Sequence, residues 1–180
     1  MEVIETKIKD LLIIKPKVFA DARGYFFESY TEAVFKKNGI SANFIQDNQS
    51  LSNAGVLRGL HFQSPPFAQG KLVRVITGAV LDVAVDIRKN SATYGENITI
   101  ELTEENKTMF YIPPGFAHGF LTLRDNTIFS YKCTNLYNKE SEGTVLWNDT
   151  DLNINWNITN PILSDKDLAG TPFKNFTSPF

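Results

Sequence analysis

The chain has 180 residues, which suits a single domain over 1–180 with a sizeable core. Its 18 Lys and Arg against 20 Asp and Glu leave a formal net charge of −2, which excludes the bulk basic field that binds nucleic acid or an anionic membrane. The single cysteine, Cys133, excludes an internal disulfide and a cysteine-based zinc site, and we interpret it as a core residue. A charged N-terminal segment without a signal-peptide core favours the cytoplasm.

In chain order the expected elements are mostly short strands, because alternating runs are broken by Gly, Pro, Asn and Asp. A short helix is expected over 31–38, between the N-cap candidate Thr31 and the stop signal Gly39. Ser164 is expected to cap a helical turn over 165–167. This balance favours an all-β jelly-roll barrel, and no Gly-rich phosphate loop follows a strand. Strands are expected over 71–77, 80–87, 97–102, 108–112, 120–123 and 127–134.

Histidine supply limits the chemistry, because His61 and His118 are the only two histidines. A metal site of three His and one Glu cannot be filled, although a site of two His and one carboxylate stays open on ligand supply. His61 has apolar neighbours and fits either a general base or a buried histidine bonded to a carbonyl. His118 follows the 113–115 turn and, taken alone, indicates a turn histidine that caps local carbonyls.

Strand alternation bears on whether Arg58 and His61 share a site. Alternation places Leu57, His61 and Gln63 on one face of a strand. Arg58 then falls on the opposite face. Both side chains reach one site only if Gly59 marks a bulge or if the site is wide.

Other polar positions have both a structural and a functional interpretation. Tyr131 shares its strand face with Phe129 and points inward, as a core tyrosine or as a proton donor in an apolar pocket. Lys71 opens a strand, where an exposed edge lysine is the common case. Asp82 and Asp86 share a strand face, so they need partners if that face lies inside the barrel.

Nine segments form a pattern when they are read together in order: KPKVF at 15–19, DARGYFFESY at 21–30, QDN at 46–48, VLRGLHFQ at 56–63, AQGKLVR at 68–74, DVAVDIR at 82–88, IPPGFAHGF at 112–120, YKCT at 131–134 and LSDKD at 163–167. Together these segments resemble the dTDP-4-dehydrorhamnose 3,5-epimerase family of cupins, and the resemblance covers nearly the whole chain. Each segment is weak alone, but their common register is a strong signal. The resemblance implies a cupin jelly-roll β-barrel with a few short helices, and it implies no metal and no cofactor.

The resemblance implies a role for each matched polar residue. His61 matches the base, and Asp167 matches the carboxylate that orients it. Tyr131 matches the proton donor on the far face of the sugar, and Lys71 matches the cation beside the keto oxygen. Tyr137 matches the aromatic residue that stacks on the thymine ring. The remaining matches are substrate-binding positions: Arg23, Glu28, Gln46, Asn48, Arg58, His118, Glu142 and Lys166.

The resemblance also implies an assembly, and the chain departs from the family's pattern at three positions. The resemblance implies a homodimer in which the segment around Arg23 reaches the partner's site. Gln49 stands where relatives often have His, and Pro114 stands where Glu is frequent. Leu136 replaces a common Tyr beside Tyr137, so the shape of the base pocket differs there.

The leading hypothesis is an epimerase that inverts C3 and C5 of a dTDP-4-keto-6-deoxyhexose in dTDP-rhamnose synthesis for a cell-surface polysaccharide. A close alternative is a C3-only or C5-only epimerase, or a 3,4-ketoisomerase, on a similar nucleotide sugar. Two further alternatives are a non-catalytic sugar-nucleotide-binding barrel and a metal-dependent cupin oxygenase or isomerase. The pairing of Tyr131 and Asp167 with His61 favours an enzyme over a binding module.

Overall fold

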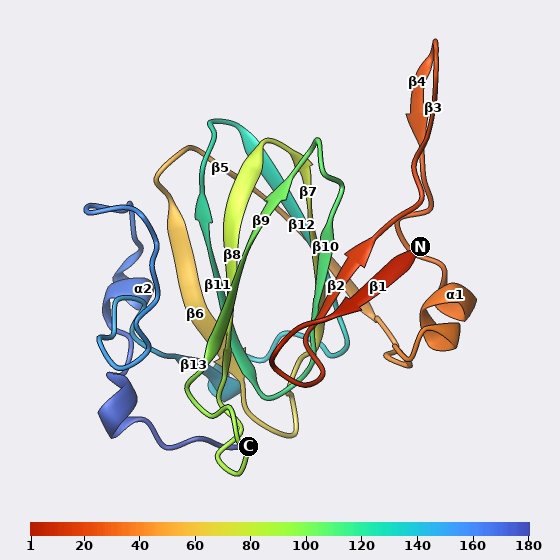
Figure 1. The fold of residues 1–180 in the computed structure, drawn as a ribbon. Helices are drawn as coiled ribbons and strands as arrows, with labels where there is room; N and C mark the ends of the chain where they lie inside the picture. Colours follow the sequence, from red (N-terminus) through yellow and green to blue (C-terminus); the bar gives the residue numbers. More distant parts are fainter.

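The computed structural model describes residues 1–180, in which eleven strands form two sheets that face each other as a barrel (Figure 1). The expected all-β jelly roll is therefore confirmed. The six-stranded sheet contains, in spatial order, β1 (Glu2–Glu5), β2 (Leu12–Lys15), β10 (Met109–Ile112), β7 (Lys71–Thr77), β12 (Thr127–Cys133) and β5 (Gln46–Ser52). The five-stranded sheet contains β13 (Glu142–Thr144), β6 (Leu57–Gln63), β11 (Phe116–Thr122), β8 (Ala79–Asp86) and β9 (Asn97–Thr103).

A separate hairpin extends away from the barrel (Figure 1) and pairs β3 (Phe19–Asp21) with β4 (Gly24–Phe26). Every residue of these two strands is exposed. No helix of the protein is long and apolar enough to span a membrane. The helices are α1 (Glu32–Lys37), α2 (Asp165–Leu168) and two short 3-10 helices, Lys139–Ser141 and Phe173–Asn175.

Both expected helices are present. In α1 the Thr31 side chain makes no capping hydrogen bond, and Gly39 follows the helix with a positive φ of 85°. In α2 the Ser164 side chain accepts from the backbone of Asp167, while the Asp167 side chain accepts from the backbone N–H of Ser164, which forms a capping box. Ser164 therefore fixes both the start of α2 and the direction of one carboxylate.

The predicted strands are confirmed with small shifts at their ends, except at β11. That strand begins at Phe116 rather than at residue 120, because Gly115 alone completes the turn with a φ of 95°. His118 consequently lies in the middle of a buried strand, and its interpretation as a turn histidine is wrong. Lys71 likewise lies in β7, between β10 and β12, so its interpretation as an edge lysine is wrong.

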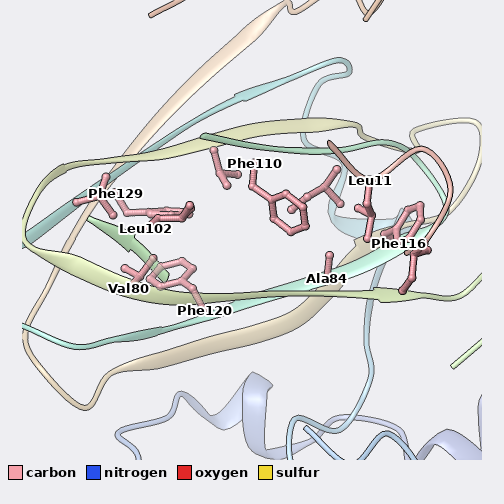
Figure 2. Close-up of a cluster of buried hydrophobic side chains, with 12 residues drawn as sticks. Leu11, Val80, Ala84, Leu102, Phe110, Phe116, Phe120 and Phe129 are labelled. Atoms are coloured by element: carbon pink, nitrogen blue, oxygen red, sulfur yellow. The ribbon is translucent and has the colours of Figure 1, made fainter. Parts of the chain in front are cut away.

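Three apolar clusters hold the layers together. The largest has 12 buried residues, and Figure 2 shows Phe110, Phe116, Phe120 and Phe129 lying between the two sheets. A second covers the outer face of the five-stranded sheet with the C-terminal segment, which contributes Trp156. A third packs α1 against the outer face of the six-stranded sheet. The C-terminal layer runs beside β6 (Figure 1) and carries α2 with it.

The bulge in β6 determines which side chains enter the barrel. His61 pairs with His118 and Arg58 pairs with Phe120, so β6 uses three steps where β11 uses two. The extra residue falls around Gly59, whose φ is 145°. A Cβ at Gly59 would lie 2.5 Å from the Cα of Gly119, so only two facing glycines permit this approach.

Substitution of Gly59 by Ala tests the bulge. We expect Gly59→Ala to lower the free energy of unfolding by about 3 kcal/mol or more, since steric overlap adds to an unfavourable φ. The matched control is Gly39→Ala, because Gly39 also has a positive φ but faces open space. The control should lose about 1 kcal/mol. Urea unfolding of both variants measures the difference, and equal losses would contradict this account of the bulge.

Candidate active site

A cavity of about 570 Å³ opens between the two sheets. It is lined from one side by β6 and β11 and from the other by β5, β7 and β12, with β13, α2 and the loop around Tyr137 at its edges. The structure brings together all the predicted site residues except Arg23 and Glu28. Those that line the cavity are His61, Asp167, Tyr131, Lys71, Gln46, Asn48, Arg58, His118, Tyr137, Glu142 and Lys166.

The bulge brings Arg58 and His61 to the same cavity. The sequence alone had left open whether these two side chains share a site. Leu57 packs in the apolar cluster behind the sheet, whereas Arg58, His61 and Gln63 line the cavity. The assignment of Leu57 and Arg58 to their faces is therefore wrong. The extra residue at Gly59 reverses the alternation between Arg58 and His61.

Asp167 is hydrogen-bonded to His61 and to the backbone of the bulge. Its Oδ1 lies 2.7 Å from Nε2 of His61 and accepts from the backbone N–H of Gly59 at 3.1 Å. Its Oδ2 accepts from the Ser164 hydroxyl at 2.6 Å. Burial opposes ionisation, but the hydrogen bonds from His61, Ser164 and Gly59 hold the pKa of Asp167 well below its usual range. The carboxylate is 2% exposed and stays ionised.

This geometry selects the nitrogen of His61 that can accept a proton. A neutral imidazole bonded to an ionised carboxylate carries its hydrogen on the nitrogen that faces the carboxylate, which here is Nε2. Nδ1 is then the nitrogen with the free lone pair. The His61 side chain is 24% exposed, so the ring remains accessible from the cavity.

His118 and Asp82 form a second buried pair beside His61. Nε2 of His118 lies 3.0 Å from each Asp82 oxygen, and Asp82 is fully buried. Burial is the main cause that lowers the pKa of His118, against the opposing effect of Asp82. Asp86, the other acid on this strand face, is bonded to Arg88, Ser91 and Thr93. Both inward-facing carboxylates therefore have partners.

Lys71 and Tyr131 line the opposite wall of the cavity, on the adjacent strands β7 and β12. Burial is the main cause that lowers the pKa of the Lys71 ammonium group, against the opposing effect of nearby Cys133 and Asp82. Burial also raises the pKa of the Tyr131 phenol, which keeps it protonated. Cys133 pairs with Lys71, is fully buried and belongs to the core, as predicted.

The mouth of the cavity contains a polar network. Tyr137 donates through its hydroxyl to Glu142 at 3.2 Å, and Lys166 forms an ion pair with the same carboxylate. Gln46 accepts from the backbone N–H of Tyr137 at 3.0 Å and donates to Asn48 at 3.1 Å. These contacts hold the predicted substrate-binding residues at the mouth against one another.

The structure places two predicted residues elsewhere. Arg23 lies in the exposed β3–β4 hairpin, where its guanidinium is bonded to Asp21 at 2.6 Å. Glu28 is exposed just after the same hairpin. Neither residue lines the cavity of its own chain.

Sequence reasoning missed several residues that line the cavity. Gln63 could have been predicted, because strand alternation had placed it on the same face as His61. Phe120 and Phe129 form an apolar wall of the cavity, with ring centroids 4.3 Å apart. Alternation in a strand cannot distinguish aromatic residues that line a cavity from those that fill the core, so the sequence did not identify these two. No group of three or more His, Cys, Asp or Glu side chains is arranged to hold a metal ion. The missed residues are Ser50, Phe62, Gln63, Gln69, Phe120, Phe129 and Ser164.

The low pKa of Asp167 predicts a contribution to acid stability. A carboxyl whose pKa is lower in the folded state stabilises the protein above its unfolded pKa, and this stabilisation is lost as the pH falls toward the folded pKa. We expect Asp167→Asn to lower the free energy of unfolding by about 2 kcal/mol or more near pH 7. The difference in free energy of unfolding between this variant and the wild type should narrow below about pH 4. Urea unfolding across this range measures the gap.

The matched control for this prediction is Asp165→Asn, on the same helix. Asp165 is exposed and makes no side-chain hydrogen bond to another residue, so its substitution should change stability little at any pH. A constant gap between wild type and Asp167→Asn from pH 7 to about pH 3 would contradict the assignment of a buried, ionised Asp167.

Known proteins match this chain in sequence and in fold. The family model described as dTDP-4-dehydrorhamnose 3,5-epimerase matches residues 5–175. The dTDP-4-dehydrorhamnose 3,5-epimerase of Shigella flexneri is 53% identical over 174 residues, which cover 96% of each chain. The crystal structure of that enzyme from Elizabethkingia anophelis is 51% identical, has a TM-score of 0.92 and covers 98% of this chain and 99% of its own.

This chain is also similar to an enzyme whose structure was solved with a bound dTDP-sugar. The Legionella pneumophila dTDP-6-deoxy-D-glucose-3,5-epimerase, solved with dTDP-4-keto-L-rhamnose, is 46% identical with a TM-score of 0.93, over 96% of this chain and 93% of its own. The match extends over nearly the whole chain in sequence and in fold. This chain therefore belongs to the dTDP-4-dehydrorhamnose 3,5-epimerase family.

Proposed function

We propose that the protein converts dTDP-4-dehydro-6-deoxyglucose into dTDP-4-dehydrorhamnose by inverting C3 and C5. The observation that carries the proposal is the arrangement of groups around one cavity. His61 and its carboxylate partner come from one wall, whereas Lys71 and Tyr131 come from the opposite wall. Inversion needs a base and an acid on opposite faces of the sugar ring, and two opposed walls supply them.

The first step is removal of a proton next to the C4 ketone. Nδ1 of His61 takes the proton from the carbon, and the electron pair of the broken C–H bond moves to the C4 oxygen, which gives an enolate. Asp167 favours this step because its negative charge stabilises the imidazolium that forms, at 2.7 Å. Lys71 stabilises the enolate oxygen, and one such donor is typically worth about 100- to 1000-fold in rate.

The second step returns a proton from the other side. The Tyr131 hydroxyl delivers its proton to the same carbon on the face opposite His61, and the C4 ketone is restored. The raised pKa of Tyr131 keeps the phenol protonated until an enolate is beside it. Proton exchange with water then resets Tyr131 and His61, and the same cycle serves the other carbon.

Deuterium exchange in heavy water tests this assignment. Wild-type enzyme with dTDP-4-keto-6-deoxyglucose should incorporate deuterium at both C3 and C5 with inversion. His61→Asn should lower exchange at both carbons by at least about 100-fold, since the base is gone. Tyr131→Phe should retain exchange but lose inversion, because His61 can return deuterium only to the face it attacked.

Each alternative has a distinct outcome in this experiment. Exchange at one carbon would indicate a C3-only or C5-only epimerase, and a 3-keto product would indicate a ketoisomerase. Binding without any exchange would indicate a non-catalytic barrel and would contradict the proposal. Chelator-sensitive turnover with stoichiometric metal would indicate a metal-dependent enzyme.

We also propose that the protein is a homodimer in which the β3–β4 hairpin completes the partner's site. The hairpin carries Arg23 and exposes Phe19, Tyr25 and Phe26, each more than half exposed, away from the barrel (Figure 1). Arg23 is suited to bind a diphosphate through a bidentate contact. Glu28, just beyond the hairpin, belongs to the same proposal.

Subunit mixing tests the shared site. Arg23→Ala and His61→Asn should each be nearly inactive alone, because each lacks one half of every site. Mixing them should restore roughly a quarter of wild-type activity, since half of the dimers formed are mixed and each mixed dimer has one intact site. No recovery in samples shown to exchange subunits would contradict a shared site.

A further inference from the structure

Gln63, the last residue of β6, holds the backbone on both sides of Tyr137. Its Oε1 accepts from the backbone N–H of Asn138 at 2.9 Å, and its Nε2 donates to the backbone carbonyl of Leu136 at 3.1 Å. The same Nε2 donates to the carbonyl of Phe67 at 2.7 Å. Gln63 is 5% exposed, so these bonds form away from bulk solvent.

Apolar packing does little to fix the loop at residues 136–138. Leu136 and Tyr137 are each 56% exposed, and neither belongs to an apolar cluster. The backbone N–H of Tyr137 itself donates to Gln46 at 3.0 Å. Two glutamine side chains, one from each sheet, therefore fix the backbone of three consecutive residues that apolar contacts leave free.

We propose that Gln63 is a positioning residue for the nucleotide, which sets the Tyr137 ring for the pyrimidine base before the substrate arrives. This inference rests on the proposed function, in which Tyr137 stacks on the base of a dTDP-sugar. A stacking residue contributes its full affinity only if little conformational freedom is lost on binding. The amide of Gln63 removes that freedom in advance, because both of its N–H groups and one acceptor position are already used.

The consequence is measurable with dTDP alone. Stacking of one base on one aromatic ring corresponds to about 5- to 150-fold in affinity. We expect Gln63→Leu to weaken dTDP binding, measured by calorimetry, within that range. The KM for the dTDP-sugar should rise by a similar factor while kcat falls less, because the groups around the ketone stay in place.

A double-mutant cycle tests whether Gln63 acts through Tyr137. Tyr137→Ala alone should weaken dTDP binding by a similar factor, and adding Gln63→Leu should then cost little more. The matched control is Gln49→Leu, because Gln49 is exposed on the outer face of β5 and should leave dTDP binding and turnover unchanged. Additive losses, or an equal loss in Gln49→Leu, would overturn the inference.

A second variant guards against misfolding. Gln63→Glu keeps the shape and can still accept from the N–H of Asn138, but it cannot donate to the two carbonyls, so it should also weaken dTDP binding. Slow exchange of the Asn138 amide hydrogen, expected in the wild type, should be lost in Gln63→Leu. Unchanged dTDP affinity in either folded variant overturns this inference alone, whereas a wild type without turnover overturns the proposed function.

Discussion

The hydrogen bonds of Asp167 are the constraint on which the site depends. One carboxylate oxygen holds both the imidazole of His61 and the backbone N–H of Gly59 in the bulge, so the His61 ring and the backbone that displays it are fixed together. This contact joins residues that are 106 positions apart in the chain. It exists because the C-terminal layer packs on the outer face of the five-stranded sheet and brings α2 to the edge of β6. The C-terminal layer therefore fixes the direction of the His61 ring, although most of this layer packs outside the barrel.

The two sheets divide the chemistry between them. The five-stranded sheet supplies both imidazoles and Asp82, and α2 adds Asp167, whereas the six-stranded sheet supplies the ammonium group and the phenol. Part of the barrel interior is filled by aromatic and aliphatic side chains, and this packing keeps the sheets at a fixed separation (Figure 2). The imidazoles can then face the ammonium group and the phenol across a ligand-sized gap. In the proposed reaction, opposed walls translate directly into opposed faces of a sugar ring.

The sequence predicted the positions of the strands along the chain better than it predicted which strands lie side by side in the sheets. Alternation located the strands, but it could not show that β7 lies inside a sheet or that β11 begins immediately after Gly115, and this misplaced Lys71 and His118. A bulge at Gly59 was one of the two conditions under which Arg58 and His61 could share a site. The predicted strand faces of Leu57 and Arg58 were nevertheless wrong, because the one inserted residue shifts the alternation of side chains. The pairing of His61 with Asp167 came only from family resemblance, since no local pattern reports a contact between distant segments.

The most direct test of the central claim is a crystal structure with a bound, unreactive dTDP-hexose. The account predicts that Nδ1 of His61 and the Tyr131 hydroxyl lie on opposite faces of the hexose ring, with Nζ of Lys71 within hydrogen-bonding distance of the oxygen on C4. A hexose with both His61 and Tyr131 on the same face, or with Tyr131 turned away from the ring, would contradict it.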